Sequence, residues 1–515
     1  MSRCVLRRVV STDRAQKPHY AGHVVAVISR VPGQLFTGML GVLRPSSAAT
    51  KEKQEAERRE RDGPNSMSPS SSGPPPKIVW FRPTDKRVPL AAIPVSEAPD
   101  DFLADPDKYQ NTLFVAAIKR WPITSLHPFG TLVDELGPVG DLEVETSALL
   151  KDAGFNIEDF GEQAAKCLPP VPWSIPEHEI ANRRDLRDER VFTIDPITAI
   201  DLDDALHVRQ LDDGNVEVGV HIADVSHFVK PNTALDREAR KRATTVYLVQ
   251  RAYPMLPPVL SESLCSLTPG EDKLTFSAIF VLTPDGRVQS TWYGRTVIRS
   301  CAQLAYDQAQ EAIEGRSLPD KIKLAEDTPH TPTGIAEDIV RMASIARHLR
   351  RRRFEGGALR IDNVKLNFHL GVDGIPHDCS VYERKESHSL IEEFMLLANT
   401  AVAQRIAVAM PEQAFLRRHE PPIERRLDGF VRRARDLGIV MDSSSAGALQ
   451  RSFDDVADPH SRLVLQVLST KAMIRAKYFC AGSVDIAKYH HYALNVPLYT
   501  HFTSRASVQD DDWLT

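Results

Sequence analysis

Cysteine is scarce in this sequence, and its six cysteines stand far apart without a single Cys-x-x-Cys pair. That scarcity argues against a thiolate zinc site and against the disulfide framework of a small secreted domain, and it favours a reducing compartment. The sequence also lacks any run of about eighteen apolar residues, the length that a membrane-spanning helix needs. The Arg-rich start, MSRCVLRRVVSTDR, lacks the apolar stretch of a secretory signal, so we expect neither secretion nor membrane insertion.

A large excess of charge of one sign is missing as well, because 64 Lys and Arg face 69 Asp and Glu and leave a net charge of −5. The whole molecule is therefore no polycation, and binding to RNA would need positive charge gathered in a groove or channel. The 515 residues, 42% of them hydrophobic, are enough for about two to four globular domains.

Changes in composition indicate where these domains lie. Residues 20–44 contain two or three short strand patterns, whereas residues 45–75 are rich in Ser, Pro, Glu and Arg and cannot build a core. Short apolar runs return over residues 76–150 between Pro and Gly, with the spacing typical of a small oligonucleotide-binding barrel. Residues 170–300 again show strand patterns, and residues 300–480 show helical ones.

Four segments after residue 200 have clear periodicity. Alternating Val and Ile over residues 216–222 predict a strand, and residues 274–299 predict a hairpin around a Pro-Asp-Gly turn. Apolar residues at helical spacing predict helices over residues 336–353 and 390–410. The second of these helices is apolar almost all round, so we expect it to be buried.

Two cations and three aromatic rings lie close together in the segment IKRWPITSLHPFG. Bases could stack on such rings while the cations hold phosphate groups, which makes Trp121 a candidate RNA contact. The alternative is that Trp121 and Phe129 belong to the core of the barrel, and composition alone favours that alternative. The residues concerned are Lys119, Arg120, Trp121, His127 and Phe129.

The most informative segment contains four aspartates within ten positions, embedded in aliphatic residues. A solvated acidic face would have Lys, Ser or Glu as neighbours, so we expect the aliphatic residues to be buried and to carry the carboxylates towards the interior. The aspartates are Asp195, Asp201, Asp203 and Asp204, and the aliphatic neighbours are Ile194, Ile197, Ile200, Leu202 and Leu206.

Clustered carboxylates are costly unless a cation lies between them, because each raises the pKa of its neighbour and burial disfavours the charged form. Aspartates with no His or Cys nearby form the hard oxygen ligand set that Mg²⁺ prefers. We therefore predict a magnesium site, in which manganese can substitute, formed by Asp195, Asp201, Asp203 and Asp204. Two such ions about 3.5–4 Å apart could clamp an in-line displacement at phosphorus.

Three other interpretations of this segment were weighed from the residues. A calcium loop beginning at Asp195 would need oxygen ligands where Ile197 and Ala199 stand, so that interpretation fails. A phosphatase that uses Asp201 and Asp203 would need a parallel doubly wound sheet, and the strand-rich flanks argue against one. An acidic surface loop without a catalytic role remains open.

At this point the sequence resembles the RNase II (RNB) superfamily, whose catalytic spacing Asp-x5-Asp-x-Asp-Asp it matches. Four further stretches agree with that family: DVSHFV at 224–229, PMLPPVLSESLCSL at 254–267, IEEFMLLAN at 391–399 and SSAGALQRS at 444–452. Upstream, PKIVWFRPTDKRVPL and IKRWPITSLHPFGTLVDELG resemble the cold-shock barrels of its cytoplasmic branch, the Dis-three-like exonuclease two group and its fungal relatives.

The resemblance implies an α+β multidomain fold, in which cold-shock β-barrels of the oligonucleotide-binding type precede a mixed α/β RNB catalytic domain. It places a partial first barrel at residues 1–44, a disordered linker or insert at 45–75, a second barrel at 76–165 and the catalytic domain at 180–515. After HFTS the family continues with Pro-Ile-Arg-Arg-Tyr, which holds its transition-state arginine, whereas this sequence reads RASVQDDDWLT. The resemblance thus implies an incomplete catalytic domain without an S1 barrel, and Arg505 is not in the register of that arginine.

The activity implied by the resemblance is processive, magnesium-dependent hydrolysis of single-stranded RNA from the 3′ end to nucleoside 5′-monophosphates. The branch prefers RNA with a 3′ uridine tail and acts without the exosome, so we expect a monomer in the cytoplasm and in processing bodies. Asp201 and Asp203 would be catalytic. Tyr247 would pack on the terminal base and Tyr306 would lie near the terminal ribose, while Glu392 or Glu393 would help to select ribose.

Two functions therefore compete. An exoribonuclease is favoured by the four retained aspartates, and an RNA-binding protein of the same family with impaired catalysis is favoured by the divergent ending. Candidate RNA contacts for the second are Lys119 with Arg120, the run Arg350–Arg353, and Arg417 with Arg418. The arginine run fits charge compensation at a helix C-terminus equally well.

Overall fold

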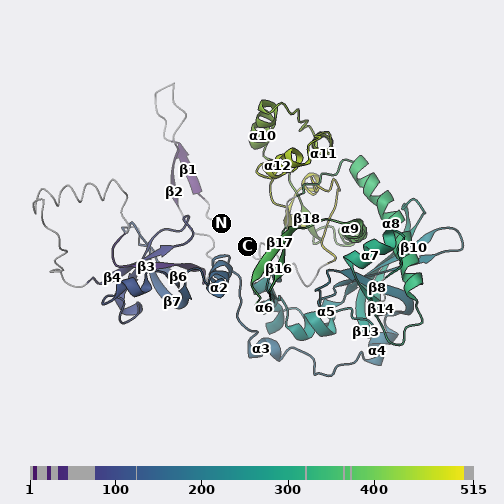
Figure 1. Cartoon of the computed structure of the whole chain (residues 1–515), viewed down its shortest axis with the longest axis horizontal. Helices are drawn as coiled ribbons and strands as arrows, with labels where there is room; N and C mark the ends of the chain where they lie inside the picture. The colour runs from purple at the N-terminus through teal and green to yellow at the C-terminus, as the bar shows by residue number, and fades with distance from the viewer. Residues whose placement is uncertain are drawn as a thin grey trace, which may run out of the picture. The chain divides into compact units, whose positions relative to one another are not determined.

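The chain divides after Asp159 into two compact units, and each is described here by itself. The computed structural model describes the following residues: 4–8, 20–24, 33–44, 76–122, 124–318, 322–362, 366–371 and 374–503 (Figure 1). The predicted linker at 45–75 lies outside these residues, as does the divergent ending at 505–515.

The first unit is built around a closed barrel of five strands in the order β3-β4-β5-β7-β6. Val79, Phe81, Ile93 and Phe114 are among the apolar side chains that fill its interior. This is the oligonucleotide-binding barrel that the sequence predicts. The elements of the unit are β1 (Cys4–Arg8), β2 (Tyr20–Val24), β3 (Leu35–Gly41), β4 (Ile78–Pro83), β5 (Ala91–Pro94), β6 (Thr112–Arg120), β7 (Phe129–Pro138) and α2 (Leu142–Asp152).

β3 is a strand of this same barrel, because it pairs antiparallel with both β4 and β6. The prediction that residues 1–44 belong to a separate first barrel is therefore wrong for residues 35–41. The pairing joins strands on either side of the segment 45–75, which lies between two neighbouring strands of one barrel. The boundary was predicted from the abrupt change in composition at that segment. Composition does not reveal that strands on either side of the segment pair with each other.

Helix α2 was not predicted, since residues 76–150 were expected to form only strands. The carboxylate of Asp141 caps the helix by accepting the backbone N–H groups of Glu143 and Val144. At the other end Asp152 accepts the backbone N–H of Thr37 at 2.6 Å and its hydroxyl at 2.5 Å. These bonds tie the helix to β3, and they join residues 115 positions apart in the chain.

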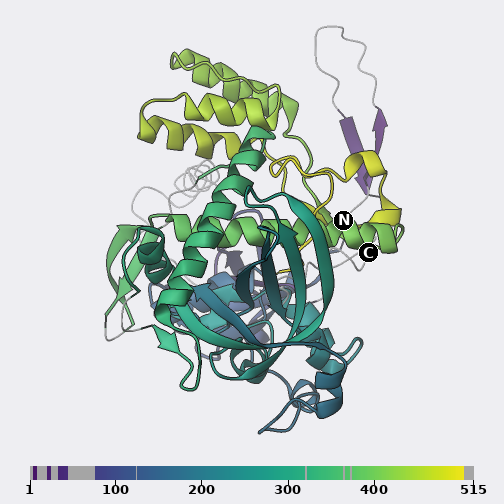
Figure 2. The ribbon, with the colours of Figure 1, turned by 90° about the vertical axis from the view of Figure 1, so that its right-hand side faces the viewer.

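The second unit contains a six-stranded sheet in the order β13-β10-β9-β8-β14-β15. β14 pairs with β13 along its first part and with β8, in parallel, along its second part, so the pairing returns to its start and the sheet curves strongly (Figure 2). The predicted hairpin at 274–299 is confirmed as β13 and β14. The strands are β8 (Arg184–Asp195), β9 (Asp204–Gln210), β10 (Val216–Ala223), β13 (Asp272–Leu282), β14 (Val288–Ala305) and β15 (Lys323–Leu324).

The alternation over residues 216–222 correctly predicts β10, yet every residue of β10 is buried. Its polar positions face other buried polar groups inside the curved sheet. His207 and His221 stack with 2.7 Å between Nδ1 of the first and Nε2 of the second, and Nδ1 of His221 lies 2.7 Å from the hydroxyl of Ser277. The polar face of the strand therefore lines an interior and does not face water.

Three helices pack on the sheet and share one core with it, in which Phe280, Ile339 and Phe394 are fully buried. They are α7 (Tyr306–Ile313), α8 (Pro332–Glu355) and α9 (Glu386–Ala409). α8 and α9 confirm the two predicted helices. The expected burial of α9 is wrong for its second half, where Gln404 and Arg405 are exposed and Val408 keeps 79% of its surface accessible.

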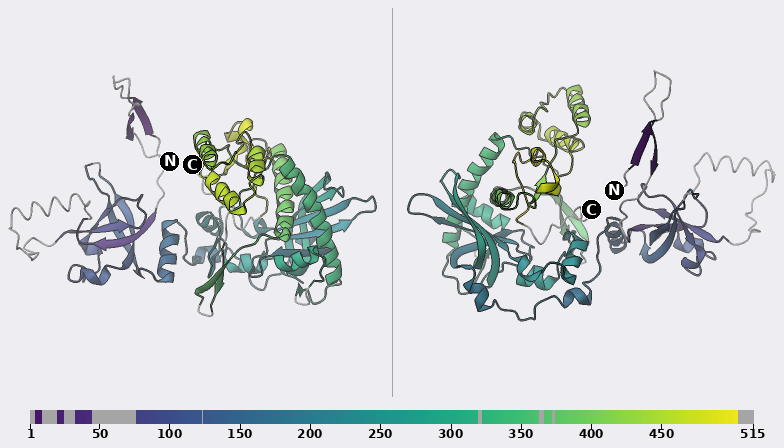
Figure 3. Two further views of the ribbon diagram at one scale, coloured as in Figure 1. Left: turned by 45° about the horizontal axis from the view of Figure 1, so that its top comes forward. Right: turned by 180° about the vertical axis from the view of Figure 1, so that it is seen from behind.

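A separate cluster of helices, α10 (Glu424–Asp436), α11 (Ala446–Asp454) and α12 (Pro459–Thr470), has its own core around Phe430, Leu449 and Phe453 (Figure 3). No helix in the described part of the chain has the length and apolar character of a membrane span. The remaining elements are α3 (Glu162–Ala165), α4 (Glu177–Ala181), α5 (Val225–Phe228), α6 (Ala234–Arg242), β11 (Val246–Tyr247), β12 (Ala252–Tyr253), the π-helical turn Val259–Leu264, β16 (Leu366–Leu370), β17 (Pro376–Val381), β18 (Phe415–Arg418) and β19 (Lys477–Cys480).

Candidate active site

Two neighbouring strands carry the four aspartates to one end of the curved sheet. Asp195 is the last residue of β8 and Asp204 is the first residue of β9, and the loop between them holds Asp201 and Asp203. β8 and β9 pair antiparallel, so the end of one strand lies beside the start of the other. Asp195 also lies opposite Ala305, the last residue of β14.

The loop is held by the segment that contains Ser266. The hydroxyl of Ser266 donates to the carbonyl of Ile200 at 2.7 Å and accepts the N–H of Leu202 at 3.2 Å. The N–H of Leu267 donates to the carbonyl of Leu202, and the N–H of Ala223 donates to the carbonyl of Asp203, both at 3.0 Å. The backbone around the carboxylates is thus fixed from two other elements, and Ser266 is a positioning residue that the sequence analysis missed.

The expected burial of the aliphatic neighbours holds only in part. Ile194, Leu202 and Leu206 are buried, but Ile197 and Ile200 keep 81% and 61% of their surface accessible. The prediction is wrong for these two because they belong to the loop, where the side chains no longer follow the pleat of a strand.

Burial and mutual repulsion raise the pKa of three of the carboxyls. The pKa of Asp195 rises to about 8, first because the surrounding protein displaces water and then because of the charge of Asp204. The same two causes raise the pKa of Asp203 to about 7, and burial raises that of Asp204 to about 6. Asp195, Asp203 and Asp204 are each partly buried, and for Asp195 and Asp203 the charges of neighbouring aspartates raise the pKa further.

The donor chemistry of the cluster fits a hard divalent cation. All of its ligand atoms would be carboxylate oxygens, and Oδ2 of Asp195 is buried without a hydrogen-bond partner in the described part of the chain. As the side chains stand, no three Asp, Glu, His or Cys within the described residues enclose a position for a metal ion.

Two tyrosines lie against the carboxylates. Tyr247 of β11 is 61% exposed, and its hydroxyl donates to Asp201. Tyr306 begins α7, next to the end of β14, and its pKa is raised by burial and then by the charges of Asp204 and Asp195. The structure thus brings both tyrosines that the resemblance singled out to the aspartate cluster.

Family models match most of the described chain. Residues 183–504 match the RNB domain, and residues 78–154 match the Dis3-like cold-shock domain 2. The chain belongs to the RNB family. Exonucleases of this family generally use a divalent metal ion. The predicted order of an oligonucleotide-binding barrel followed by an RNB domain is confirmed.

Relatives of this RNB protein include both enzymes and inactive proteins. It is 46% identical to DIS3-like exonuclease 2 of Xenopus tropicalis over 85% of this chain and 54% of that protein. It is 41% identical to a protein of Arabidopsis thaliana named inactive exonuclease DIS3L2, over 83% of this chain and 42% of that protein. The structure of yeast Ssd1, a pseudonuclease, matches with a TM-score of 0.72 and 32% identity over 96% of this chain and 55% of that one. The chain spans about half the length of the curated relatives it matches.

The two glutamates of α9 are both engaged with arginines of the RNB domain. Glu393 is buried and accepts from Arg353 at 2.5 Å through a guanidinium that contacts both of its oxygens. Glu392 is half-buried and pairs with Arg384. Glu392 therefore keeps accessible surface, whereas Glu393 is buried.

Trp121 lies in the other unit and is not part of the barrel core. Its ring keeps 55% of its surface accessible, and its Nε1 donates to the carbonyl of Ser125 at 3.1 Å. The neighbouring Phe129 is half-buried beneath the guanidinium of Arg120, which lies 5.0 Å from the ring centre. The core alternative is wrong for Trp121, and an exposed ring beside Lys119 and Arg120 suits base stacking.

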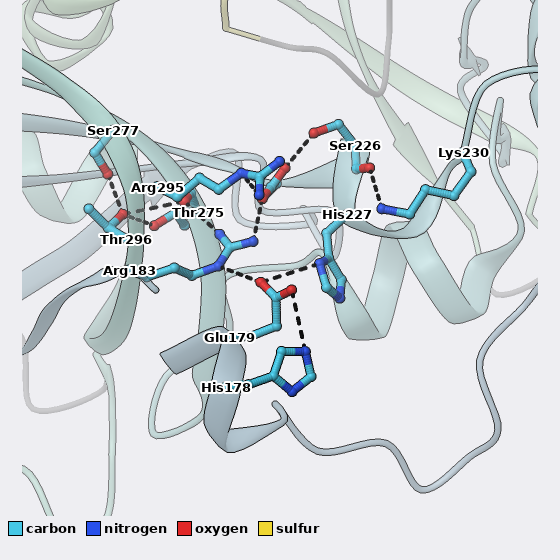
Figure 4. A network of polar contacts seen from close by, with 11 residues as sticks. His178, Glu179, Arg183, Ser226, His227, Lys230, Thr275, Ser277, Arg295 and Thr296 are labelled. Atoms are coloured by element: carbon cyan, nitrogen blue, oxygen red, sulfur yellow. Dashed lines mark hydrogen bonds and ion pairs between the residues drawn. The ribbon is translucent and has the colours of Figure 1, made fainter. Parts of the chain in front are cut away.

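A buried network of ion pairs and hydrogen bonds surrounds Arg183 (Figure 4). Arg183, whose side chain is fully buried, donates to Asp224 at 2.8 Å, to Glu179 at 3.2 Å and to the carbonyl of Thr275 at 3.2 Å. Asp224 directly follows Ala223, whose N–H holds the carbonyl of Asp203. The network was missed, and the available signal was an aspartate placed immediately after a fully buried strand.

The raised pKa values predict that the metal-free protein loses stability as the pH rises. A carboxyl whose pKa is higher in the folded state than its usual value of about 3.9 binds its proton more tightly in the folded state. The stability that it contributes is therefore fully present below about pH 3.9. It disappears as the pH passes through the folded-state pKa, here about 6 to 8. In EDTA, urea denaturation should show the free energy of unfolding falling by about 1–3 kcal/mol between pH 6 and 8.

Magnesium should restore more stability at pH 8 than at pH 6, because at pH 6 protons compete for the carboxyls. Asp195→Asn removes the group with the highest of these pKa values and should flatten the dependence in EDTA. An unchanged slope in that variant, together with no effect of magnesium at pH 8, would contradict the interpretation of the cluster.

Proposed function

We propose that this chain is a magnesium-dependent exoribonuclease that hydrolyses single-stranded RNA from its 3′ end and releases nucleoside 5′-monophosphates in the cytoplasm. The observation that carries the proposal is that all four aspartates are retained where β8 meets β9, with three carboxyl pKa values raised by burial and mutual charge. A group of carboxyls that destabilise one another is poor as a structural element and suited to a cation-dependent reaction.

Each aspartate of the cluster has its own role in the proposed reaction. Magnesium, when bound, would neutralise the carboxylates and stabilise negative charge on the phosphate. Asp201 and Asp203 stand on the loop and orient the water that attacks phosphorus, while Asp195 and Asp204 anchor the site on the strand ends. The backbone bonds from Ser266 and Ala223 keep the loop in place during this step.

Aromatic rings and charged side chains around the aspartate cluster would hold the substrate. Tyr247 offers an exposed ring whose hydroxyl is fixed by Asp201, which suits packing on the last base. We further propose a preference for RNA with a 3′ uridine tail and action as a monomer without the exosome. This rests on the similarity to the DIS3-like exonuclease 2 proteins.

An RNA-binding protein without catalysis is the second candidate. It is favoured by the similarity to yeast Ssd1, described as a pseudonuclease, and to the inactive Arabidopsis protein. Three arginines of the run named for it already have partners: Arg351 contacts His348, Arg352 donates to the carbonyl of Gly286, and Arg353 pairs with Glu393.

The two candidates are separated by incubating the purified chain with a single-stranded RNA that carries a 5′ label. The exoribonuclease should shorten the labelled strand stepwise and release nucleoside 5′-monophosphates in magnesium, faster with a uridine tail than with an adenosine tail, and not in EDTA. Intact RNA after long incubation, bound in a salt-sensitive manner, would establish the second candidate instead.

A further inference from the structure

A positively charged pocket lies between α8 and α9, outside the aspartate cluster. It is a cavity of about 220 Å³ with an apolar floor of Ala343, Ala346 and Leu390. Five cationic side chains line it: Arg347, Arg350, Arg360, Arg384 and Lys385. No part of the proposed reaction described above uses this pocket.

Four of the five cations have a carboxylate partner. Arg347 pairs with Glu386, Arg360 with Asp362, Arg384 with Glu392, and Lys385 with Asp307. These pairs compensate the charge at the rim of the pocket. Their geometry also fixes the directions of the guanidinium groups around the cavity.

Arg350 differs from the other four, because no carboxylate among the described residues pairs with it. Its guanidinium donates to the hydroxyl of Ser389 and lies 5.6 Å from the ring centre of Phe354. Burial and then the charge of Arg360 lower its pKa, whereas the charge of Glu392 acts in the opposite direction. Glu392 pairs with Arg384 and Glu393 pairs with Arg353, so Arg350 has no carboxylate of its own and an incoming anion would supply one.

The shape and chemistry of the pocket fit a phosphate monoester. A guanidinium presents a planar fork of donors that matches phosphate oxygens. The apolar floor beside the cations suits the ribose or base attached to such a phosphate. An inorganic anion would leave that floor without a partner.

The pocket shares the first turn of α9 with the wall of the aspartate site. His388 lies in that turn, and its ring stacks on Tyr306 with 4.0 Å between the ring centres. Tyr306 in turn stands beside Asp195 and Asp204, and Lys385 pairs with Asp307, the residue after Tyr306. The stacked rings of Tyr306 and His388 thus connect the aspartate cluster to the first turn of α9, which lines the pocket.

We propose that the pocket between α8 and α9 binds the 5′-phosphate of a nucleoside 5′-monophosphate and holds this product before it leaves. The identity of the ligand rests on the function proposed above, whereas the phosphate chemistry rests on Arg350 and its neighbours. The pocket then makes the protein sensitive to its own product, since an occupied pocket delays the next release.

The test is titration of uridine 5′-monophosphate, uridine and inorganic phosphate into the full chain with the substitution Asp203→Asn, in magnesium, by isothermal calorimetry. The monophosphate should bind, uridine should not, and inorganic phosphate should bind more weakly. Adding Arg350→Ala should weaken binding of the monophosphate about tenfold or more. Arg405→Ala, which removes an exposed arginine of the same helix α9, should leave it unchanged.

Arg360→Gln provides a second variant that weakens binding should Arg350→Ala fail to fold, which thermal melting will reveal. Equal affinity for uridine 5′-monophosphate in the Arg350 and Arg405 variants overturns the proposal, and so does equal affinity for inorganic phosphate and the monophosphate. Because binding is measured in an Asp203 variant, it does not depend on activity. If the wild-type chain cleaves RNA but the titration shows no binding, only the pocket proposal is overturned. If the titration shows binding but the wild-type chain never cleaves RNA, only the proposed function is overturned.

Discussion

Replacing Asp203 by Asn is expected to lower the release of mononucleotides from single-stranded RNA by about three orders of magnitude. The amide has the size of the carboxyl, but it carries no negative charge and turns one of the two oxygens into a donor. The loop that carries Asp203 is held through its backbone by Ala223 and Ser266, so it should keep its conformation. The loss should therefore appear in kcat, measured by quantifying mononucleotides over time.

Binding and folding serve as controls for this variant. RNA binding, followed by fluorescence anisotropy, should stay unchanged, and stability in EDTA should hold or rise, because a carboxyl with a raised pKa has been removed. Asp212→Asn changes an exposed aspartate in the turn between β9 and β10 and should have wild-type activity. If Asp203→Asn and Asp212→Asn cleave RNA equally well, the aspartate cluster is not the catalytic centre.

Arg183→Met is expected to cost about 3–5 kcal/mol of stability, the largest effect of any single change outside the aspartates. The side chain of Arg183 has no exposed surface and that of Asp224 has 1%, so the substitution removes the direct ion pair of a buried carboxylate, which keeps only the hydroxyl of Ser226 and the more distant Arg295. The carbonyl of Thr275 loses one of its donors as well. Urea denaturation of the whole chain, read by the fluorescence of its tryptophans, measures the change.

Arg287→Met is the matched control, because its pair with Asp285 is on the surface, where 72% of the Arg287 side chain is exposed. It should change stability by less than about 1 kcal/mol. The double variant Arg183→Met with Asp224→Asn should lose less than the sum of the single losses, since the second change removes the orphaned charge. Strict additivity, or a loss as small as that of the control, would show that the pair contributes little.

The network around Arg183 also bears on activity. Asp224 follows the residue whose N–H holds Asp203, so a shift of this corner moves the catalytic loop. Partial activity in a folded Arg183→Met protein would be accompanied by a weaker response to magnesium, because the carboxyls would no longer converge at the strand ends.

Strands and helices were predictable where one pattern dominates a segment. β10, the β13–β14 hairpin and the two long helices follow from alternation or helical spacing within their own residues. α2 was missed although Asp141 is a local helix-start signal, whereas its tie to β3 through Asp152 and Thr37 depends on a strand far away in the sequence. The exposed end of α9 was missed because burial depends on what packs against a helix.

The sequence by itself determined that four aspartates stand together among aliphatic residues, that they suit a hard cation, and that their spacing resembles one family. Only the tertiary structure decided which neighbours are buried, that β3 completes the later barrel, that Ser266 and Arg183 hold the catalytic loop, and that five cations enclose a pocket beside Tyr306. The physical reason is that spacing and hydrophobic periodicity act over a few residues. Strand register, burial and the pairing of charges are instead set by residues tens to hundreds of positions away.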